Sequence, residues 1–332
     1  MTAPIRHDYV KTYFTLYEHF EQDQNGTSHR GHPYDYATKT LILFFTIMMI
    51  RRIHTFKAQS RWLNQHSDLA NQLGFDRLPV RTTLVRRFKQ LYPTLQAFIA
   101  FLGEWAEGLS KDFDSQVLIE DASLFKAHGP VWHQSDRAAQ RVPDKLRNLD
   151  QDASWGNSAY HGWVYGYSLH LTCNRAGFPK LAQVETASVD ESVVFEQKKV
   201  ALFAFQPQSI VGDNAYFKAM RVRQWATEGV LLLSPATAWK NGKYAQAYHR
   251  FIQRMPVAQW LKCRKTAIEP IFDLFSKVLG TVNNHKQLPI QSLKKVQPFL
   301  CLGVLVVQMA MIVNNVFSLP FRQIASILSA LS

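Results

Sequence analysis

The chain has 332 residues, 47% of them hydrophobic, which is enough for a well-packed core and for two structural units. Its 38 Lys and Arg outnumber 25 Asp and Glu. The formal charge of +13 favours a polyanionic partner such as nucleic acid, although a basic enzyme with a small substrate would show the same excess. Three widely spaced cysteines support neither a disulfide framework nor a structural zinc site, and they fit a reducing cytoplasm.

The first part of the chain is predicted to be helical and basic. Residues 1–108 repeat apolar side chains every three or four positions, so we expect an all-helical DNA-binding region here and a second unit over 109–332. Between Arg51 and Gln90, seven Arg and two Lys stand against two Asp, a net +7 that is more than half of the chain's excess. The opening residues are polar and aromatic and show no secretion signal.

Two helices in this basic segment suggest a helix-turn-helix. One is predicted over 60–70 and ended by Gly74, and the other runs from Pro79 to Phe88 with Arg86 and Arg87 on either side of its outward face. Arg81 would lie at the helix start, where recognition helices usually touch bases. The residues expected to contact DNA are Arg61, Arg81, Arg86, Arg87 and Lys89. The alternative is that these side chains are only solvated surface.

From residue 117 onwards the pattern changes to strands. A short apolar strand leads to Asp121, and residues 163–173 and 181–187 alternate in polarity as a hairpin. A helix is predicted over 188–205, and a buried strand then delivers Asp213 to its carboxyl end. Helix 217–227, strand 230–233 and a helical last part follow. This order predicts an α/β fold, a mixed sheet with helices on its faces.

Three carboxylates stand out in that arrangement. Asp121 and Asp213 are predicted at strand ends, and Glu269 lies on a helical pattern whose apolar stripe is Ile268, Ile271, Phe272, Phe275 and Leu279. Gathered carboxylates repel one another unless cations sit between them, and hard oxygen ligands suit Mg²⁺ or Mn²⁺. Two such ions can activate an attacking oxygen and stabilise the leaving oxygen of a phosphodiester. Asp273 competes with Glu269, and Glu120 competes with Asp121 but would face the other side of its strand.

The motifs around these residues resemble those of the DDE transposases of bacterial insertion sequences. The second Asp of that family lies in an apolar-Gly/Ala-Asp-x-x-Tyr motif, similar to Val211-Gly212-Asp213-Asn214-Ala215-Tyr216. Its first Asp ends a strand, and its Glu lies on a helix beside basic residues, as Asp121 and Glu269 are expected to do. The resemblance covers roughly residues 115–320. It implies an RNase H-like catalytic domain. Only 56 positions separate Asp213 from Glu269, so we expect the compact kind, without the large β-rich insertion that some of these transposases carry.

The resemblance also implies a function. Such an enzyme binds the terminal inverted repeats of its element, hydrolyses the phosphodiester at each end and joins the freed 3′-OH to target DNA. Asp121 and Asp213 would bridge two Mg²⁺ or Mn²⁺ ions, and Glu269 would complete the second site. The implied partner is double-stranded DNA, from transposon ends and target, bound by a homodimer. The implied location is the bacterial cytoplasm, at the nucleoid when DNA is bound.

The basic residues around Glu269 depart from the family pattern. Many relatives carry an Arg four positions before the Glu and a Lys seven positions after it, where this chain has Lys265 and Ser276. Arg264 and Lys277 stand one step away, so we expect DNA contacts from Arg264, Lys265 and Lys277, with either of the first two reaching phosphate. The remaining alternatives are a DNA-binding protein of the same fold without catalysis, and a metal-dependent nuclease without strand transfer.

For three further features, a structural role is predicted ahead of a functional one. The histidines that could suggest zinc lack ligand spacing; they are His128, His133, His161 and His170. Core packing is expected for Trp132, Trp155 and Trp163, with stacking on an unpaired base as the alternative. The apolar run over 299–317 is long enough for a membrane span, but its Gln308, Asn314 and Asn315 favour a buried helix.

Overall fold

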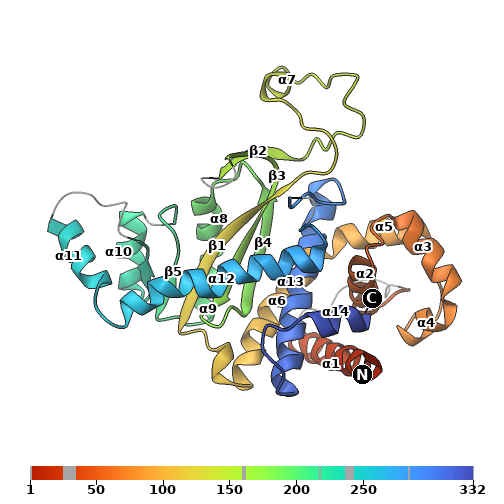
Figure 1. Ribbon diagram of the computed structural model, residues 1–332, viewed down its shortest axis with the longest axis horizontal. Helices are drawn as coiled ribbons and strands as arrows, with labels where there is room; N and C mark the ends of the chain where they lie inside the picture. The colour runs from red at the N-terminus through yellow and green to blue at the C-terminus, as the bar shows by residue number, and fades with distance from the viewer. Residues whose placement is uncertain are drawn as a thin grey trace.

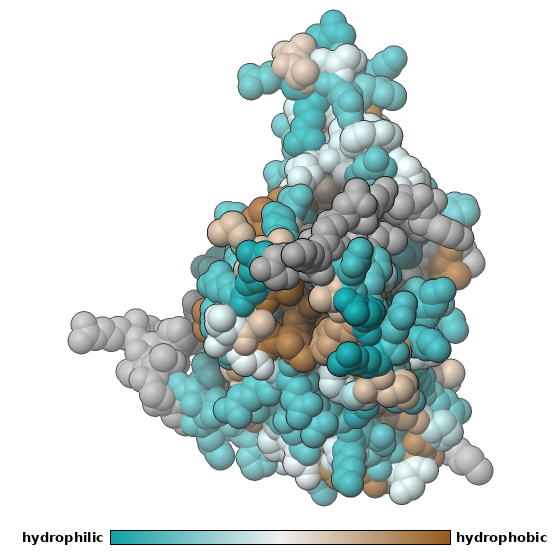
Figure 2. All heavy atoms as spheres, turned by 90° about the vertical axis from the view of Figure 1, so that its left-hand side faces the viewer, coloured by the Kyte–Doolittle hydropathy of each residue, from teal (hydrophilic) through white to brown (hydrophobic). Residues whose placement is uncertain are grey.

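The computed structural model describes residues 2–24, 35–158, 162–216, 218–235, 243–282 and 285–331. A sheet lies between helices, and the N-terminal helices pack beside it along the long C-terminal helix α13 (Figure 1). The segment around α7 projects from the body as an arm (Figures 1 and 2). His161 and Phe217 lie outside the described residues, so the predictions that involve them stay predictions.

The described N-terminal region is all helical, as expected. Its helices are α1 (Thr2–Asp23), α2 (Thr38–Ile50), α3 (Phe56–Gln65), α4 (Ser67–Gln72), α5 (Arg81–Gln90) and α6 (Tyr92–Trp105), followed by short 3₁₀ turns over Ala106–Gly108 and Lys111–Phe113. The single helix predicted over 60–70 is wrong, because the chain breaks at His66 into α3 and α4. The second predicted helix begins at Arg81 instead of Pro79, since Val80 is extended and precedes the first helical turn.

The sheet has six strands and is mixed. They are β1 (Val117–Lys126), β2 (Ser154–Ser158), β3 (Gly162–Asn174), β4 (Pro179–Thr186), β5 (Ser209–Val211) and β6 (Leu231–Leu233). The order is β2-β3-β1-β5-β6, and β4 pairs with the half of β3 that β2 leaves free. β1 is antiparallel to β3 and parallel to β5, and β5 is parallel to β6. The sequence patterns predicted each of these strands except β2.

The register between β1 and β5 places two carboxylates side by side. Their last parallel pair joins Ile119 to Val211, and Asp121 and Asp213 each follow two positions later. Because strand side chains alternate, both aspartates belong to the face that Ile119 and Val211 occupy. Asp121 does not end its strand, contrary to expectation. β1 continues to Lys126 because the longer β3 keeps offering hydrogen-bonding partners beyond the point where β5 stops.

The remaining helices cover the two faces of the sheet. One face carries α8 (Glu191–Gln197), α9 (Lys199–Ala204) and α10 (Ala219–Thr227), whose apolar side chains form a small separate core with Leu118 and Ile210. The other face carries α12 (Val257–Leu279) and α13 (Leu293–Val316). The elements outside these layers are α7 (Gln134–Ala138), α11 (Lys243–Ile252) and α14 (Ala325–Leu331). The helix predicted over 188–205 is in fact α8 and α9, which meet at Lys198.

The long apolar helix α13 is the centre of the larger core. It is the one described helix whose length and composition would suit a membrane span, but 94% of its most apolar window is buried inside the fold. Its polar side chain at Gln308 donates to the carbonyls of Ile99 and Pro179 at 2.9 and 2.8 Å, which joins α6 to the start of β4. The buried core is continuous from the N-terminal helices to α14. The boundary near residue 108 stays a prediction.

A glycine explains part of the motif around Asp213. A side-chain carbon on Gly212 would come within 2.8 Å of the ring of Tyr216, which is fully buried against Phe195. The Gly and the Tyr therefore form one packing unit, and Asp213 lies in the tight loop between them.

We predict that Gly212→Ala lowers the free energy of unfolding by about 1–3 kcal/mol through overpacking against Tyr216. Gly108→Ala is the matched control, because a side-chain carbon added at Gly108 would meet no atom within 4 Å. Urea denaturation of both variants measures the difference. Equal midpoints for the two variants would contradict the packing argument.

Candidate active site

The three predicted carboxylates line one cleft. Asp121 reaches it from β1, Asp213 from the loop after β5, and Glu269 from the middle of α12. The cleft has a volume of about 840 Å³, and its walls also include Glu191, Arg264, Asp273 and Lys286. The structure therefore brings together residues that are up to 148 positions apart in the sequence, which is the distance from Asp121 to Glu269. On the side of α10 and α11 the molecular surface is hollowed, with hydrophobic residues at the floor and hydrophilic residues around it (Figure 2).

Asp121 is the most enclosed of the three. It is 9% exposed, and its two carboxylate oxygens accept from the Ala122 amide and from Arg264 Nη2, both at 3.0 Å. Burial raises the pKa of Asp121 and the charge of Asp213 raises it further, whereas Arg264 lowers it. These contacts fix the direction in which the carboxylate points.

Asp213 and Glu269 are more open to solvent. Asp213 Oδ1 accepts from the amide of Ala215 at 2.8 Å, an Asx turn that holds the loop after β5. Glu269 is exposed on α12, and the apolar stripe beneath it is buried as expected. The helix continues through Pro270. Ser276 is buried, and its hydroxyl donates to the Phe272 carbonyl.

A guanidinium occupies the space among the three acids. Besides its ion pair with Asp121, Arg264 interacts electrostatically with Asp213 and Glu269. Burial alone would lower the pKa of Arg264, but the charge of Asp121 and then those of the other two acids outweigh burial and raise it. The site thus already stabilises one positive charge at the position where its carboxylates converge.

The chemistry of the site suits a divalent cation, although its present arrangement does not close around one. Three carboxylates are the hard oxygen donors that Mg²⁺ and Mn²⁺ prefer. Within the described ranges, no group of three His, Cys, Asp or Glu side chains stands close enough to hold one ion. A cation would therefore require Arg264 to leave Asp121 and the carboxylates to draw together.

Comparison with known proteins identifies the family. The transposase DDE domain family matches residues 112–286, which is more than half of the chain and includes all three acids. The chain belongs to the DDE transposase family. No curated protein matches it in sequence.

Two solved structures of transposase complexes show low sequence identity and low structural similarity to this chain. The "Crystal structure of the Mos1 Strand Transfer Complex" shares 11% identity over 92% of this chain and 81% of that chain, with a TM-score of 0.29. The "Crystal structure of a pre-cleavage Mos1 transpososome" shares 9% identity over 88% and 81%, with a TM-score of 0.21. The family assignment rests on the domain match and not on these likenesses. The mixed sheet with β1 between β3 and β5 is the RNase H-like fold expected for the family.

The structure adds a fourth carboxylate that the sequence did not single out. Glu191 follows Asp190, the N-cap of α8, whose carboxylate accepts from Ser192 N at 2.8 Å. Glu191 lines the cleft, and burial followed by the charge of Asp213 raises its pKa from 4.5 to about 7. The sequence shows it only as an ordinary acid in a first helical turn, so no signal distinguished it.

A lysine in the cleft was also missed. Lys286 lies after α12 and donates to Ser123 Oγ at 2.7 Å, with its ammonium near the rings of Phe125 and Phe272. Burial lowers the pKa of Lys286, and Asp273 and Asp121 raise it. The backbone of this loop bonds to the end of β1, because Lys126 N donates to the Lys286 carbonyl. This long-range pairing has no local sequence pattern.

Four other residues named in the predictions differ in where they lie relative to the cleft. Glu120 faces away from the cleft, as expected, and its carboxylate is fully buried against Lys198 at 2.7 and 2.8 Å. Trp163 was expected in the core but is 62% exposed and lines the cleft, because β3 begins at the sheet edge. Lys277 lines a 430 Å³ pocket that adjoins the cleft and shares Asp273 and Lys286 with it, whereas Lys265 is exposed and lines neither space.

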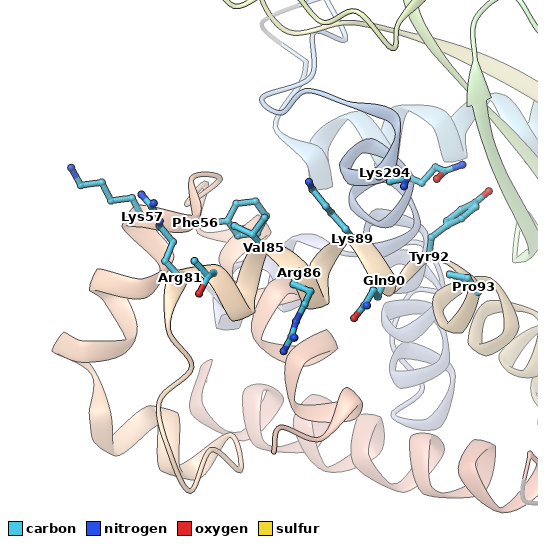
Figure 3. Close-up of a pocket in the computed structure, with 12 residues that line it drawn as sticks. Phe56, Lys57, Arg81, Val85, Arg86, Lys89, Gln90, Tyr92, Pro93 and Lys294 are labelled. Atoms are coloured by element: carbon cyan, nitrogen blue, oxygen red, sulfur yellow. The ribbon is translucent and has the colours of Figure 1, made fainter. Parts of the chain in front are cut away.

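The five N-terminal residues predicted to contact DNA fall into three groups. Arg81, Arg86 and Lys89 line a groove on α5 (Figure 3). Arg61 is exposed on α3 outside that groove. Arg87 is 3% exposed and donates to Thr38 Oγ1 at 3.0 Å, so the prediction that it contacts DNA from an outward face is corrected. One turn after Leu84, the helix turns Arg87 inward toward α2.

The raised pKa of Glu191 predicts that the stability of the metal-free transposase depends on pH. A carboxyl whose folded pKa is raised binds its proton more tightly in the folded state, so stability falls as pH rises from 4.5 through about 7. We predict that Glu191→Gln raises the free energy of unfolding at pH 8 by about 1–2 kcal/mol and changes it little at pH 4. Urea denaturation in EDTA at both values measures this.

Asp144→Asn serves as the control for Glu191→Gln. Asp144 is exposed and forms no ion pair within the described chain. An equal gain for the two variants at pH 8 would show that general surface charge, and not the cleft, causes the effect.

Proposed function

We propose that this transposase cuts DNA at the ends of a bacterial insertion sequence and joins the freed 3′-OH to target DNA. The observation that carries this proposal is the convergence of Asp121, Asp213 and Glu269 on one cleft from three separate elements. A DNA-binding protein without catalysis would gain nothing from gathering acids that repel both one another and DNA. The proposed partners are the element's terminal repeats and target DNA.

Mg²⁺ or Mn²⁺, two per site, is the proposed cofactor. Asp121, Asp213 and Glu269 would hold the ions, which when bound would activate the attacking oxygen and neutralise charge on the leaving oxygen. The chain's own contribution is orientation: the Ala122 amide and the paired strands hold Asp121, and the Asx turn holds Asp213. Since both aspartates are anchored by backbone, only α12 and Arg264 need to adjust.

The cations in the cleft are suited to bind phosphate. Lys286 is held by a hydroxyl and not by an acid, so its ammonium keeps donors for a phosphodiester oxygen. Once Arg264 leaves Asp121, its planar fork can also take a phosphate. Lys277 lies in the adjoining pocket, where the DNA strand would continue. A homodimer assembled on DNA in the bacterial cytoplasm completes the proposal.

Alanine substitutions of the trio test the assignment. We predict that Asp121→Ala, Asp213→Ala and Glu269→Ala each reduce cleavage in Mg²⁺ at least about 10³-fold, because each removes a ligand oxygen. Binding to DNA in EDTA should change less than about threefold, which is under 0.7 kcal/mol. The substrates are duplexes carrying the DNA that flanks the gene, and cut ends are counted on denaturing gels.

Asp273→Ala is the matched control for the trio. Asp273 lines the same cleft one helical turn from Glu269 and is exposed. Substantial cutting by Asp213→Ala, or a loss with Asp273→Ala equal to that with Glu269→Ala, would overturn the assignment. Transfer of a labelled 3′ end to a second DNA separates a transposase from a nuclease of the same fold.

Arg264 and the cation compete for Asp121 in this proposal. We predict that Arg264→Gln binds Mn²⁺ about tenfold more tightly than the wild type in the absence of DNA, since it removes a charge in direct contact with a ligand. Titration calorimetry measures the affinity without turnover. Lys265→Gln is the control, because Lys265 is adjacent in sequence but lies outside the cleft. The same gain for both variants would contradict direct competition.

A further inference from the structure

A second large concave surface lies on the N-terminal helices, away from the residues of the cleft. This groove has a volume of about 990 Å³ and shares no lining residue with the cleft. Its walls come from α3, α5, α6 and the first turn of α13 (Figure 3). It therefore joins helices on both sides of the predicted boundary near residue 108.

The groove is lined by cations and by no acid. Five basic residues line it: Lys57 from α3, Arg81, Arg86 and Lys89 from α5, and Lys294 from α13. Within the described residues none of the five forms an ion pair with a carboxylate. The other polar groups in the lining are hydroxyls and amides, from Thr82, Gln90, Tyr92 and Gln297. Like charges held together without acids leave the groove with a favourable site for a polyanion.

Helix α5, which presents three of these cations, is packed firmly against the core on its inner side. Leu84 is fully buried, and Phe88 packs edge-on against Phe45 and Phe56 with ring centroids 4.7 and 5.4 Å apart. Arg87 is bonded to Thr38 on the inner side. With this inner side fixed, the backbone of α5 sets the spacing of Arg81, Arg86 and Lys89 along its outer side.

The charges of α5 and α13 act on one another. Lys295, next to Lys294, has a lowered pKa because of burial and then because of the positive charge of Lys89. Figure 3 shows Lys89 and Lys294 on the same side of α5, whereas Arg86 points to the other side. The positive field is thus spread across the exposed width of the helix.

We propose that this groove binds the sugar-phosphate backbone of duplex DNA, and that Lys294 on α13 grips it together with Arg81, Arg86 and Lys89. The inference deepens the proposed function, on which it rests for the choice of DNA as partner. Arg81 and Lys89 are eight residues apart, about 12 Å along the helix, with Arg86 on another side. One phosphate cannot reach all of them, but duplex DNA carries about one charge per 1.7 Å of its axis.

The composition of the groove distinguishes DNA from an acidic polypeptide. Arginine forks and lysine ammonium groups spaced along a helix match a regular phosphate backbone, and the Thr82 hydroxyl and the Gln90 amide beside them are further donors to phosphate oxygens. Most of the groove's cations come from α5, but the grip is incomplete without α13. An isolated N-terminal fragment would lack Lys294.

Salt-dependent binding by the full-length protein tests the proposal. Affinity for a fluorescein-labelled duplex of random sequence is measured by anisotropy in EDTA over a range of NaCl concentrations. Each lost phosphate contact should lower the slope of log affinity against log salt by about one unit. We predict that Lys294→Gln and Lys89→Gln each show this decrease and a several-fold loss of affinity, and that the Lys89→Gln, Lys294→Gln double variant loses about two units.

Lys111→Gln is the matched control, because Lys111 is exposed on a 3₁₀ turn, lines neither the groove nor the cleft, and forms no ion pair in the described chain. The proposal is overturned if Lys294→Gln behaves like Lys111→Gln, or if poly-glutamate displaces the duplex as well as unlabelled DNA does. Arg81→Ala should weaken binding to the element's own ends more than to random duplex, and equal losses would limit Arg81 to phosphate contact.

Binding and cleavage separate this proposal from the proposed function. Loss of cleavage in Asp213→Ala together with normal binding by the groove variants would overturn the groove and leave the transposase reaction standing. Weak binding by the groove variants together with full cleavage by Asp213→Ala would overturn the reaction and support the groove.

Discussion

The parallel pairing of β1 with β5 is the constraint on which the site depends. It stops at Ile119 and Val211, and the chain places an aspartate two positions beyond each. A slip of one residue would turn Asp121 to the opposite face and bring Glu120 into the cleft. Glu120 is instead bonded to Lys198 in the buried layer beneath α8 and α9. Because a slip would separate this buried ion pair, the pair strongly disfavours it.

The second constraint is the position of α12. This helix brings Glu269 and Arg264 to the two aspartates, and its apolar stripe fixes its rotation against the sheet. Its last turn is held by Arg52 of the N-terminal region, whose guanidinium donates to the carbonyls of Lys277 and Val278. A cation at the carboxyl end of a helix also suits the helix dipole. The geometry of the cleft thus depends on a residue far outside the family-matched segment.

Sequence patterns predicted what is local and missed what is long-range. Strand alternation identified β3 and β4, and helical spacing found the buried stripe of α12, because both arise from side chains a few residues apart. The tight link between Gly212 and Tyr216 likewise appears as a short motif. Lys286 and Glu191 enter the cleft through loop pairing and helix docking, which no short window records. Arg87 was misjudged because exposure on a short helix depends on the neighbour, here Thr38 of α2, that receives its inner side.

The shared role of α13 bears on how such a protein can change its DNA preference. One side of this helix packs against β4 and α12, and another packs against α1, α2, α5 and α6. Cutting the chain near residue 108 would uncover apolar surface on both pieces, and a foreign N-terminal region would have to match that surface residue by residue. The shared core therefore disfavours exchange of the N-terminal region as a whole. Under the proposed binding of DNA by α5, new specificity would arise by substitution on the outer side of this helix, with the inner side left intact.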